Sequence, residues 1–212
     1  MKYVDFCSLL GDQPYFEIAM AAQLSGESRQ TLRTQLHRWS KAGKLLPLRR
    51  GMYAFSDPPR RRTINPASLS NYLYKPSYLS TYWALGYYGL IPERVAVFTG
   101  VTTRVPREFV NDFGVFRYSN IKQDLFFGYR SVLMDQHKVL LAEPEKALLD
   151  MWHLQRGAWD HARMSGMRFQ AMELTNERRL VDYARRFRSP RIERAVEHWK
   201  ALAASRDDSV AL

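Results

Sequence analysis

The sequence predicts an α+β protein, with an N-terminal winged helix-turn-helix followed by a mixed α/β domain that has a small sheet and a helical C-terminal region. Three observations lead to this class. Residues 14–55 read as helix, turn, helix and hairpin; several segments rich in Val, Phe and Tyr follow between residues 95 and 142; and the pattern from residue 160 onward is helical. The expected boundaries are 1–57 for the first domain, 58–64 for a linker and 65–212 for the second domain.

The first two helices are predicted from apolar residues at helical spacing in residues 2–10 and 16–24. Ser25-Gly26 supplies the break after the second stretch. Cys7 is the single cysteine of the chain, so it forms no internal disulfide and makes no thiolate zinc site. We expect it to be a small buried apolar residue on the first helix.

A third helix is predicted over residues 28–41, with Ser28 as its N-cap. Leu32, Leu36 and Trp39 fall on one stripe, which is expected to face the domain core. The opposite face carries side chains that suit a DNA groove, because Arg pairs with guanine, Gln pairs with adenine, and Thr offers a hydroxyl and a methyl group. The predicted DNA-binding residues of this helix are Ser28, Arg29, Gln30, Thr31, Arg33, Thr34 and Arg38.

A short basic hairpin is predicted next, in the run LLPLRRGMYAF. Its tip contains Arg49 and Arg50, which we expect to rest on phosphates or to enter the minor groove. The prolines of the following segment cannot continue a helix or a central strand, which indicates a linker. Arg60, Arg61 and Arg62 in this linker are either solvated linker residues or contacts to the DNA backbone beside the hairpin, and their nearness to the hairpin slightly favours the second for Arg60 and Arg61.

Two other interpretations of residues 1–57 remain open. A charged helix face is usually a solvated face, and helix-turn-helix geometry also occurs in protein-binding modules. The combination of a short helix, its polar and basic face and an Arg-Arg-Gly hairpin favours double-stranded DNA. The alternative is an interaction module that uses a helix-turn-helix shape to bind a partner protein.

The overall composition supports a polyanionic partner. The chain has 212 residues, a formal net charge of +11 and a pI near 9.9, and 46% of its residues are hydrophobic, which is enough for real cores. No stretch approaches the length of a spanning helix, and the N-terminus lacks the layout of a signal peptide. We therefore expect a cytoplasmic protein without a membrane partner, and a monomer in solution.

The second domain is expected to begin with a helix capped by Asn65, with Pro66 at its first position. Ser80 is the predicted start of an apolar helix ending near Gly89. A small sheet of about four strands is then expected from the segments 95–103, 114–121, 125–134 and 137–142. Glu143-Pro144 starts the next helix, with carboxylates at its positive end.

The C-terminal helices are rich in arginine, with acidic residues interspersed. The favoured interpretation is a solvated helical face, and a second phosphate-contacting or partner-binding surface is the minor alternative. Ser189-Pro190 indicates the start of the last helix.

Four motifs in order resemble the AbiEi-type antitoxins of type IV toxin-antitoxin systems: RRGMYAF, KPSYLSTYWALGYYGLIP, VAVFTGVTT and LLAEPEKALLD. The likeness covers residues 14–150. It implies a repressor that binds inverted repeats in its own promoter, and an antitoxin that counters a nucleotidyltransferase-fold toxin encoded beside it, functionally or by direct contact.

By position, the resemblance assigns the DNA-reading helix to residues 28–41 and the wing to residues 49–53. It places Pro144, Glu145, Lys146 and Asp150 in the signature helix of the second domain. The chain after Asp150 matches the family pattern least well.

Candidate catalytic chemistry is sparse. Glu143, Glu145 and Asp150 cluster near His137 and His153, but a paired-His metal spacing is absent, and acids at a helix start are explained by the macrodipole. The sequence has no Gly-rich phosphate loop and no nucleophile elbow. We expect no enzyme activity, no cofactor and no metal.

Overall fold

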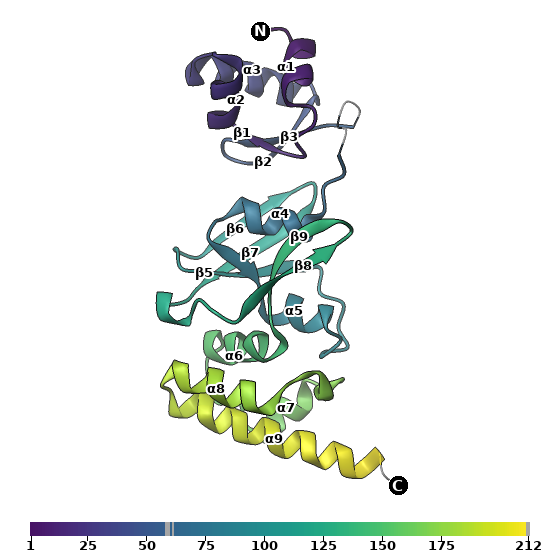
Figure 1. Ribbon diagram of the computed structural model, residues 1–212, viewed down its shortest axis with the longest axis vertical. Coiled ribbons are helices and arrows are strands. Elements are labelled where there is room, and N and C mark those ends of the chain that lie inside the picture. The colour runs from purple at the N-terminus through teal and green to yellow at the C-terminus, as the bar shows by residue number, and fades with distance from the viewer. Residues whose placement is uncertain (58–59, 61, 211–212) are drawn as a thin grey trace.

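The computed structural model describes residues 1–57, 60 and 62–210; for residues 206–210 it describes the backbone only. This part of the chain is a mixed α+β structure with nine α-helices, a three-stranded antiparallel sheet and a six-stranded mixed sheet. Along the long axis, the small sheet and α1–α3 lie at one end, the six-stranded sheet lies in the middle, and α6–α9 lie at the other end (Figure 1). The predicted α+β class is confirmed.

The N-terminal unit contains the predicted helices and hairpin, and in addition one short strand that was not predicted. Its elements are α1 (Tyr3–Leu10), β1 (Phe16–Glu17), α2 (Ile18–Ser25), α3 (Arg29–Lys41), β2 (Leu45–Arg49) and β3 (Met52–Phe55). The strand order is β1-β3-β2. The two residues of β1 gave no alternating pattern to recognise. Cys7 is half-buried, so the expectation of a buried cysteine was wrong.

The small sheet separates two hydrophobic clusters. Leu45 and Phe55 are cross-strand partners and pack with α1–α3 around Phe6 and Trp39. Side chains on the other face of this sheet pack instead against the six-stranded sheet and α4: the cluster contains Leu48, Met52, Ala54, Leu69, Leu73, Tyr74, Phe116 and Tyr118. Because neighbouring strand residues alternate between faces, α3 and the second unit lie on opposite sides of the small sheet.

The six-stranded sheet has the order β6-β7-β5-β4-β9-β8. Its elements and the helices beside them are α4 (Pro66–Leu73), β4 (Ser77–Leu79), α5 (Thr81–Tyr87), β5 (Val97–Thr102), β6 (Arg107–Asn111), β7 (Gly114–Asn120), η1 (Gln123–Leu125), β8 (Tyr129–Met134) and β9 (His137–Ala142). The pairs β5/β7 and β4/β9 are parallel, and the other neighbours are antiparallel.

The expectation of about four strands was too low. The missing strands are β4, which has three residues, and β6, whose sequence REFVN is mostly polar because it lies at an edge of the sheet. The segment 125–134 is also shorter as a strand than predicted. It begins in a 3-10 turn and passes Gly128, whose φ of +69° is left-handed, before β8 starts at Tyr129.

The predicted helix starts at Asn65 and Ser80 can be compared with the hydrogen bonds of these two side chains. Asn65 caps α4 by accepting from the Ser68 backbone N–H at 3.0 Å, as predicted. Ser80 precedes α5, but its side chain makes no cap bond. Its hydroxyl donates to Asp150 Oδ2 at 2.7 Å. The predicted helix start at Ser80 is nevertheless confirmed, because α5 begins at Thr81 with Ser80 in the N-cap position.

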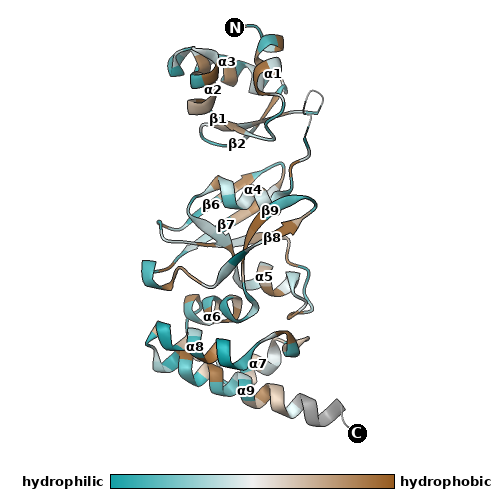
Figure 2. Ribbon diagram, viewed as in Figure 1, coloured by the Kyte–Doolittle hydropathy of each residue, from teal (hydrophilic) through white to brown (hydrophobic). Residues whose placement is uncertain are grey.

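The C-terminal region is helical, as expected. It consists of α6 (Pro144–Leu154), α7 (His161–Gly166), η2 (Met172–Leu174), α8 (Glu177–Phe187) and α9 (Pro190–Val210). Figure 2 shows α8 as mostly hydrophilic, whereas parts of β8 and β9 are hydrophobic. Buried residues of α6, α8 and α9, including Trp152, Leu180 and Trp199, belong to the same core cluster as Tyr78 and Leu141 of the six-stranded sheet.

Two arginines of this region are bound to the protein and are not part of a freely solvated face. Arg191 donates to the carbonyl oxygens of Trp152, His153, Gln155 and Gly157 at 2.7 to 3.0 Å. Arg186 lies 3.5 Å from the ring centre of Phe127. In the part of the chain that the structure describes, no helix is both long and apolar enough to cross a bilayer.

Candidate nucleic-acid interface

The α3 helix starts and packs as its sequence predicts. Ser28 Oγ accepts from the Thr31 backbone N–H at 3.1 Å, which confirms the N-cap, and the hydroxyls of these two residues lie 2.9 Å apart. Leu32 and Leu36 are fully buried, and Trp39 is 4% exposed. Because this stripe faces the core, the other side of the helix is turned to solvent.

The structure places the predicted DNA-binding residues of α3 together on that exposed side. All seven are exposed: Ser28, Arg29, Gln30, Thr31, Arg33, Thr34 and Arg38. Among the described residues, no carboxylate lies within ion-pair distance of Arg29, Arg33 or Arg38. The face therefore presents free guanidinium groups, while the Ser28 and Thr31 hydroxyls are used in the cap.

The hairpin arginine Arg49 lies elsewhere. Its Nη2 is 2.6 Å from Glu17 Oε1, and its side chain is 25% exposed. Glu17 and Arg49 are both cross-strand partners of Met52, which packs toward the second unit. Since cross-strand partners project to the same face, Arg49 points away from the side of the sheet on which α3 packs.

The linker arginines are not gathered beside α3 either. Arg60 has a side chain that is 17% exposed and lies 3.7 Å from Asp57 Oδ2. It also lies 5.7 Å from the ring centre of Phe113, in the turn after β6. Arg61 lies outside the described residues. The structure therefore groups the α3 residues and separates them from Arg49 and Arg60.

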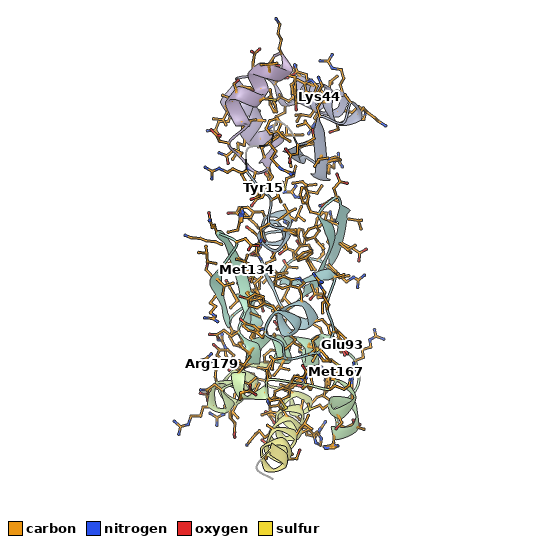
Figure 3. All side chains as sticks on the ribbon, turned by 90° about the vertical axis from the view of Figure 1, so that its right-hand side faces the viewer. Tyr15, Lys44, Glu93, Met134, Met167 and Arg179 are labelled. Carbon is orange, nitrogen blue, oxygen red and sulfur yellow. The ribbon has the colours of Figure 1, made fainter. Side chains whose placement is uncertain are left out.

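The two units pack directly against each other. The rings of Tyr15 and Tyr72 are 5.0 Å apart, and Asn111 Nδ2 donates to the Leu48 carbonyl oxygen at 3.0 Å. Figure 3 shows Tyr15 at the level where the N-terminal unit meets the six-stranded sheet. The hairpin is thus docked on the second unit along one face.

A basic cavity lies at this contact, and we call it the junction pocket. It has a volume of about 400 Å³, and cations from four elements or turns line it: Arg49, Arg50, Lys75, Arg104 and Arg107. Lys75, Arg104 and Arg107 carry no sequence motif that marks them as binding residues. Each lies within two residues of a proline, in a turn or at a strand start, and nothing in a single sequence brings such turns together.

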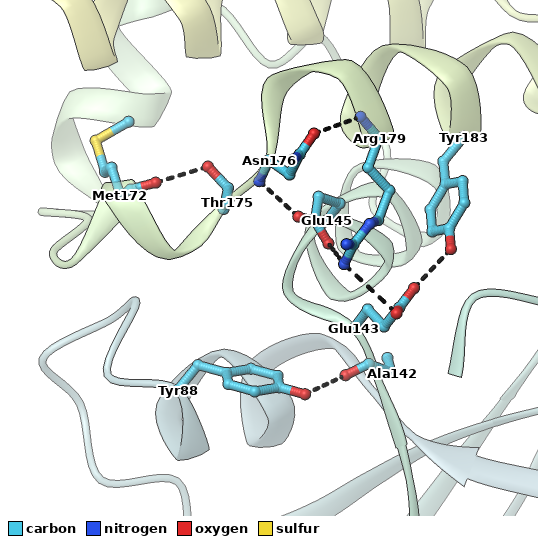
Figure 4. Close-up of polar contacts among 9 residues, drawn as sticks. All are labelled: Tyr88, Ala142, Glu143, Glu145, Met172, Thr175, Asn176, Arg179 and Tyr183. Carbon is cyan, nitrogen blue, oxygen red and sulfur yellow. Dashed lines mark hydrogen bonds and ion pairs between the residues drawn. The ribbon is translucent and has the colours of Figure 1, made fainter. Parts of the chain in front are cut away.

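The acidic residues of α6 act as structural groups within this chain. Figure 4 shows Glu143 and Glu145 between α6 and α8. Glu145 Oε1 accepts from the Asn176 backbone N–H at 2.6 Å, and Glu143 Oε2 accepts from the Tyr183 hydroxyl at 2.6 Å. Arg179 lies 3.5 and 3.6 Å from the two carboxylates. These contacts fasten the start of α8 to the start of α6.

A second polar cluster is buried one turn further along α6. Lys146 and Asp150 are fully buried and form an ion pair, and Asp150 also accepts from the Tyr78 hydroxyl at 3.0 Å. Burial lowers the pKa of Lys146, an effect that Asp150 opposes, and burial raises the pKa of Tyr78. Because both side chains are fully buried, the pair suits a core anchor better than acid-base chemistry.

His137 and His153 do not complete a metal site with these acids. The ring of His153 packs 5.3 Å from that of Phe187. Within the described residues, no group of three or more His, Cys, Asp or Glu side chains is arranged to hold a metal ion.

Comparisons with known proteins add no assignment: no protein-family model and no curated protein matches this chain. The functional interpretation therefore depends on the α3 face and on the motifs of residues 14–150.

Proposed function

We propose that the protein is a DNA-binding transcriptional repressor and an antitoxin of a type IV toxin-antitoxin system. In this proposal α1–α3 with β1–β3 form a winged helix-turn-helix, and α3 is the helix that reads double-stranded DNA. The single observation that carries it is the exposed polar face of α3, which presents unpaired arginines opposite the buried stripe of Leu32, Leu36 and Trp39.

Base readout is assigned to the first turns of α3. In helix-turn-helix proteins the N-terminal residues of the second helix contact base edges in the major groove. Arg29 and Arg33 are four residues apart and share one helix face, so both guanidinium groups can address neighbouring guanines, while Gln30 suits adenine. Arg38, in the last turn, is placed to contact phosphate.

The wing has a smaller part in this proposal than the sequence suggested. Arg50 is exposed at the hairpin tip and remains a candidate for a phosphate contact. Arg49 is engaged by Glu17 and faces the second unit, so its first role is to position the hairpin. Of the two hairpin arginines, only Arg50 is therefore proposed to contact DNA.

The antitoxin half of the proposal is supported by the likeness of residues 14–150 to AbiEi-type antitoxins. In that likeness the signature helix corresponds to α6, where Glu145, Lys146 and Asp150 are all buried. They would shape the second domain, and any contact with a nucleotidyltransferase-fold toxin would fall on the surface around them. A nucleotidyltransferase gene beside the gene for this protein would support this half.

A mobility-shift titration with the DNA upstream of its own gene tests the repressor. We expect a saturable shift that competitor DNA of unrelated sequence does not abolish. The variants Arg29→Ala and Arg33→Ala should each lose about 1–3 kcal/mol of specific binding, with relaxed sequence preference. Arg185→Ala removes an equal charge from the exposed face of α8 and is the matched control. Unchanged specific binding in the double α3 variant would remove α3 from the interface.

Separation of function tests the antitoxin. The Arg29→Ala/Arg33→Ala protein keeps its second unit intact, so it should still rescue cells that express the neighbouring toxin while it fails to repress the promoter. Loss of rescue in a variant that remains folded by circular dichroism would mean that antitoxicity depends on α3.

A protein-partner module is the second candidate, and one observation favours it. Val4 is 72% exposed on α1, and Met20 and Leu24 are 41% and 51% exposed one turn apart on α2. Exposed apolar groups of this kind mark interaction surfaces when they adjoin. This candidate predicts salt-labile DNA binding without sequence preference, and co-elution of the wild-type protein with the neighbouring gene product.

A further inference from the structure

The junction pocket carries more positive charge than the protein neutralises. Among the described residues, five cations line it, and Glu17 is the single carboxylate in its wall. That carboxylate is already engaged, because its Oε1 lies 2.6 Å from Arg49 Nη2. Among the described residues, no acidic side chain forms an ion pair with Arg50, Lys75, Arg104 or Arg107.

Aromatic rings hold these cations in place. Lys75 Nζ lies 4.0 Å from the ring centre of Tyr72, and the Arg104 guanidinium lies 4.5 Å from that of Tyr74. The Arg104 Nη1 atom also donates to the Lys75 carbonyl oxygen at 3.2 Å. Cation–π contacts and this bond fix the positions of the charged heads without cancelling their charge.

The pocket also has the size and the location of a ligand site. Its volume of about 400 Å³ is within the usual range for small-molecule pockets, about 300–1,000 Å³. Its wall combines the β2–β3 turn with the end of α4 and the start of β6, so an occupant would touch both units. The pocket lies on the face of the small sheet that is turned away from α3, which separates it from the proposed DNA-reading surface.

We infer that the junction pocket binds a small anion with two or more phosphoryl groups, held by Arg50, Lys75, Arg104 and Arg107. Arginine guanidinium groups bind phosphate oxygens through paired hydrogen bonds, and lysine adds a point charge. Four cations without carboxylate partners match a linear polyphosphate better than a single phosphate.

The ligand would also couple the two units. Arg50 belongs to the hairpin, whereas Arg104 and Arg107 belong to the six-stranded sheet and its preceding turn. An anion that bridges them neutralises their mutual repulsion and stabilises the docked arrangement of the hairpin. Binding is therefore expected to raise the melting temperature of the whole protein.

Calorimetric titration of the full-length protein with tripolyphosphate and, separately, with nucleoside triphosphates tests the inference. We expect one saturable site that weakens with added salt, and about tenfold weaker binding in Arg104→Ala/Arg107→Ala than in the wild-type protein. Arg50→Ala, on the other unit, should weaken binding as well. The matched control is Arg178→Ala/Arg185→Ala on the exposed face of α8, which should leave binding unchanged. Tighter binding of a nucleoside triphosphate than of tripolyphosphate would show that the pocket also contacts the nucleoside.

Three results would overturn the inference. One is the absence of saturable binding of either probe to the wild-type protein. Another is an equal loss of anion affinity in the α8 control variant, which would show that the affinity depends only on the net charge of the protein. The third is loss of duplex DNA binding in Arg104→Ala/Arg107→Ala with no small-anion site in the wild-type protein, which would make the pocket part of a DNA interface. Circular dichroism melting of each variant verifies that it is folded.

Discussion

Arg49 of the β2–β3 hairpin is held by Glu17 of β1, with 2.6 Å between Nη2 and Oε1. This pair ties the hairpin turn to the strand that leads into α2. A second bond, from Arg49 Nη1 to the Arg50 carbonyl oxygen at 3.2 Å, closes the turn. A residue whose position in the sequence suggests DNA contact thus stabilises the local structure.

Arg49→Ala is therefore expected to act mainly on stability. Exposed ion pairs contribute about 0.2–1 kcal/mol, and the lost turn bond adds to this, so we expect about 1 kcal/mol less free energy of unfolding. Sequence preference for DNA should be unchanged. Urea denaturation and a mobility-shift assay measure the two effects, with Arg185→Ala on the exposed face of α8 as the control. A changed sequence preference with unchanged stability would return Arg49 to the DNA surface.

The buried ion pair on α6 should respond unequally to single and double substitution. Asp150→Asn leaves the Lys146 ammonium buried without its counter-charge, which costs about 3–5 kcal/mol in comparable pairs. Lys146→Met/Asp150→Asn removes both charges and should cost less than Asp150→Asn alone. Chemical denaturation of the wild-type protein, Lys146→Met, Asp150→Asn and the double variant measures this. Additive losses would show that the pair is not coupled.

Arg191 is expected to be required for the α6–α9 contact. Its guanidinium donates to four carbonyl oxygens at and beyond the end of α6, where backbone acceptors lack helical partners. Arg191→Lys keeps the charge but cannot form this array, so we expect a loss of about 2 kcal/mol in stability. Arg194→Lys, at an exposed position of α9, is the control and should be neutral. Equal melting temperatures for both variants would contradict this role.

His153 gives the protein a predictable response to acid. Burial lowers its pKa from the ordinary value of 6.5; Asp150 opposes this, and Arg191, Lys146 and Lys122 add to it. Below pH 6.5 His153 is protonated in the unfolded chain but stays neutral in the folded protein until its lower pKa is reached. The free energy of unfolding therefore falls as the pH drops through 6.5.

His153→Gln should flatten that fall, because no proton is then taken up at this position on unfolding. Denaturation midpoints between pH 7.5 and the folded-state pKa of His153 measure the slope, and His137→Gln on β9 serves as the control. If His153→Gln leaves the slope below pH 6.5 unchanged, another group is responsible for acid sensitivity.

Sequence-based predictions were correct where the feature depends only on residues that are close together in the chain. The side chains of Ser28 and Asn65 accept hydrogen bonds from free backbone N–H groups in the first turns of α3 and α4. Both caps were predicted from residue type and position. The Leu32, Leu36 and Trp39 stripe was equally readable, because helical spacing alone places these side chains on one face. Strands β1, β4 and β6 were missed because they are short or polar, and neighbouring strands supply the hydrogen bonds that define them.

The sequence by itself determined the α+β class, the bounds of α3 and the polar face of that helix, since these follow from spacing and capping within a few turns of chain. Only the tertiary structure decided where the remaining charges lie. It turned Arg49 toward Glu17, buried Lys146 with Asp150, and collected Lys75, Arg104 and Arg107 into one pocket. The physical reason is that ion pairing and burial depend on side chains distant in sequence, whose proximity no local pattern encodes.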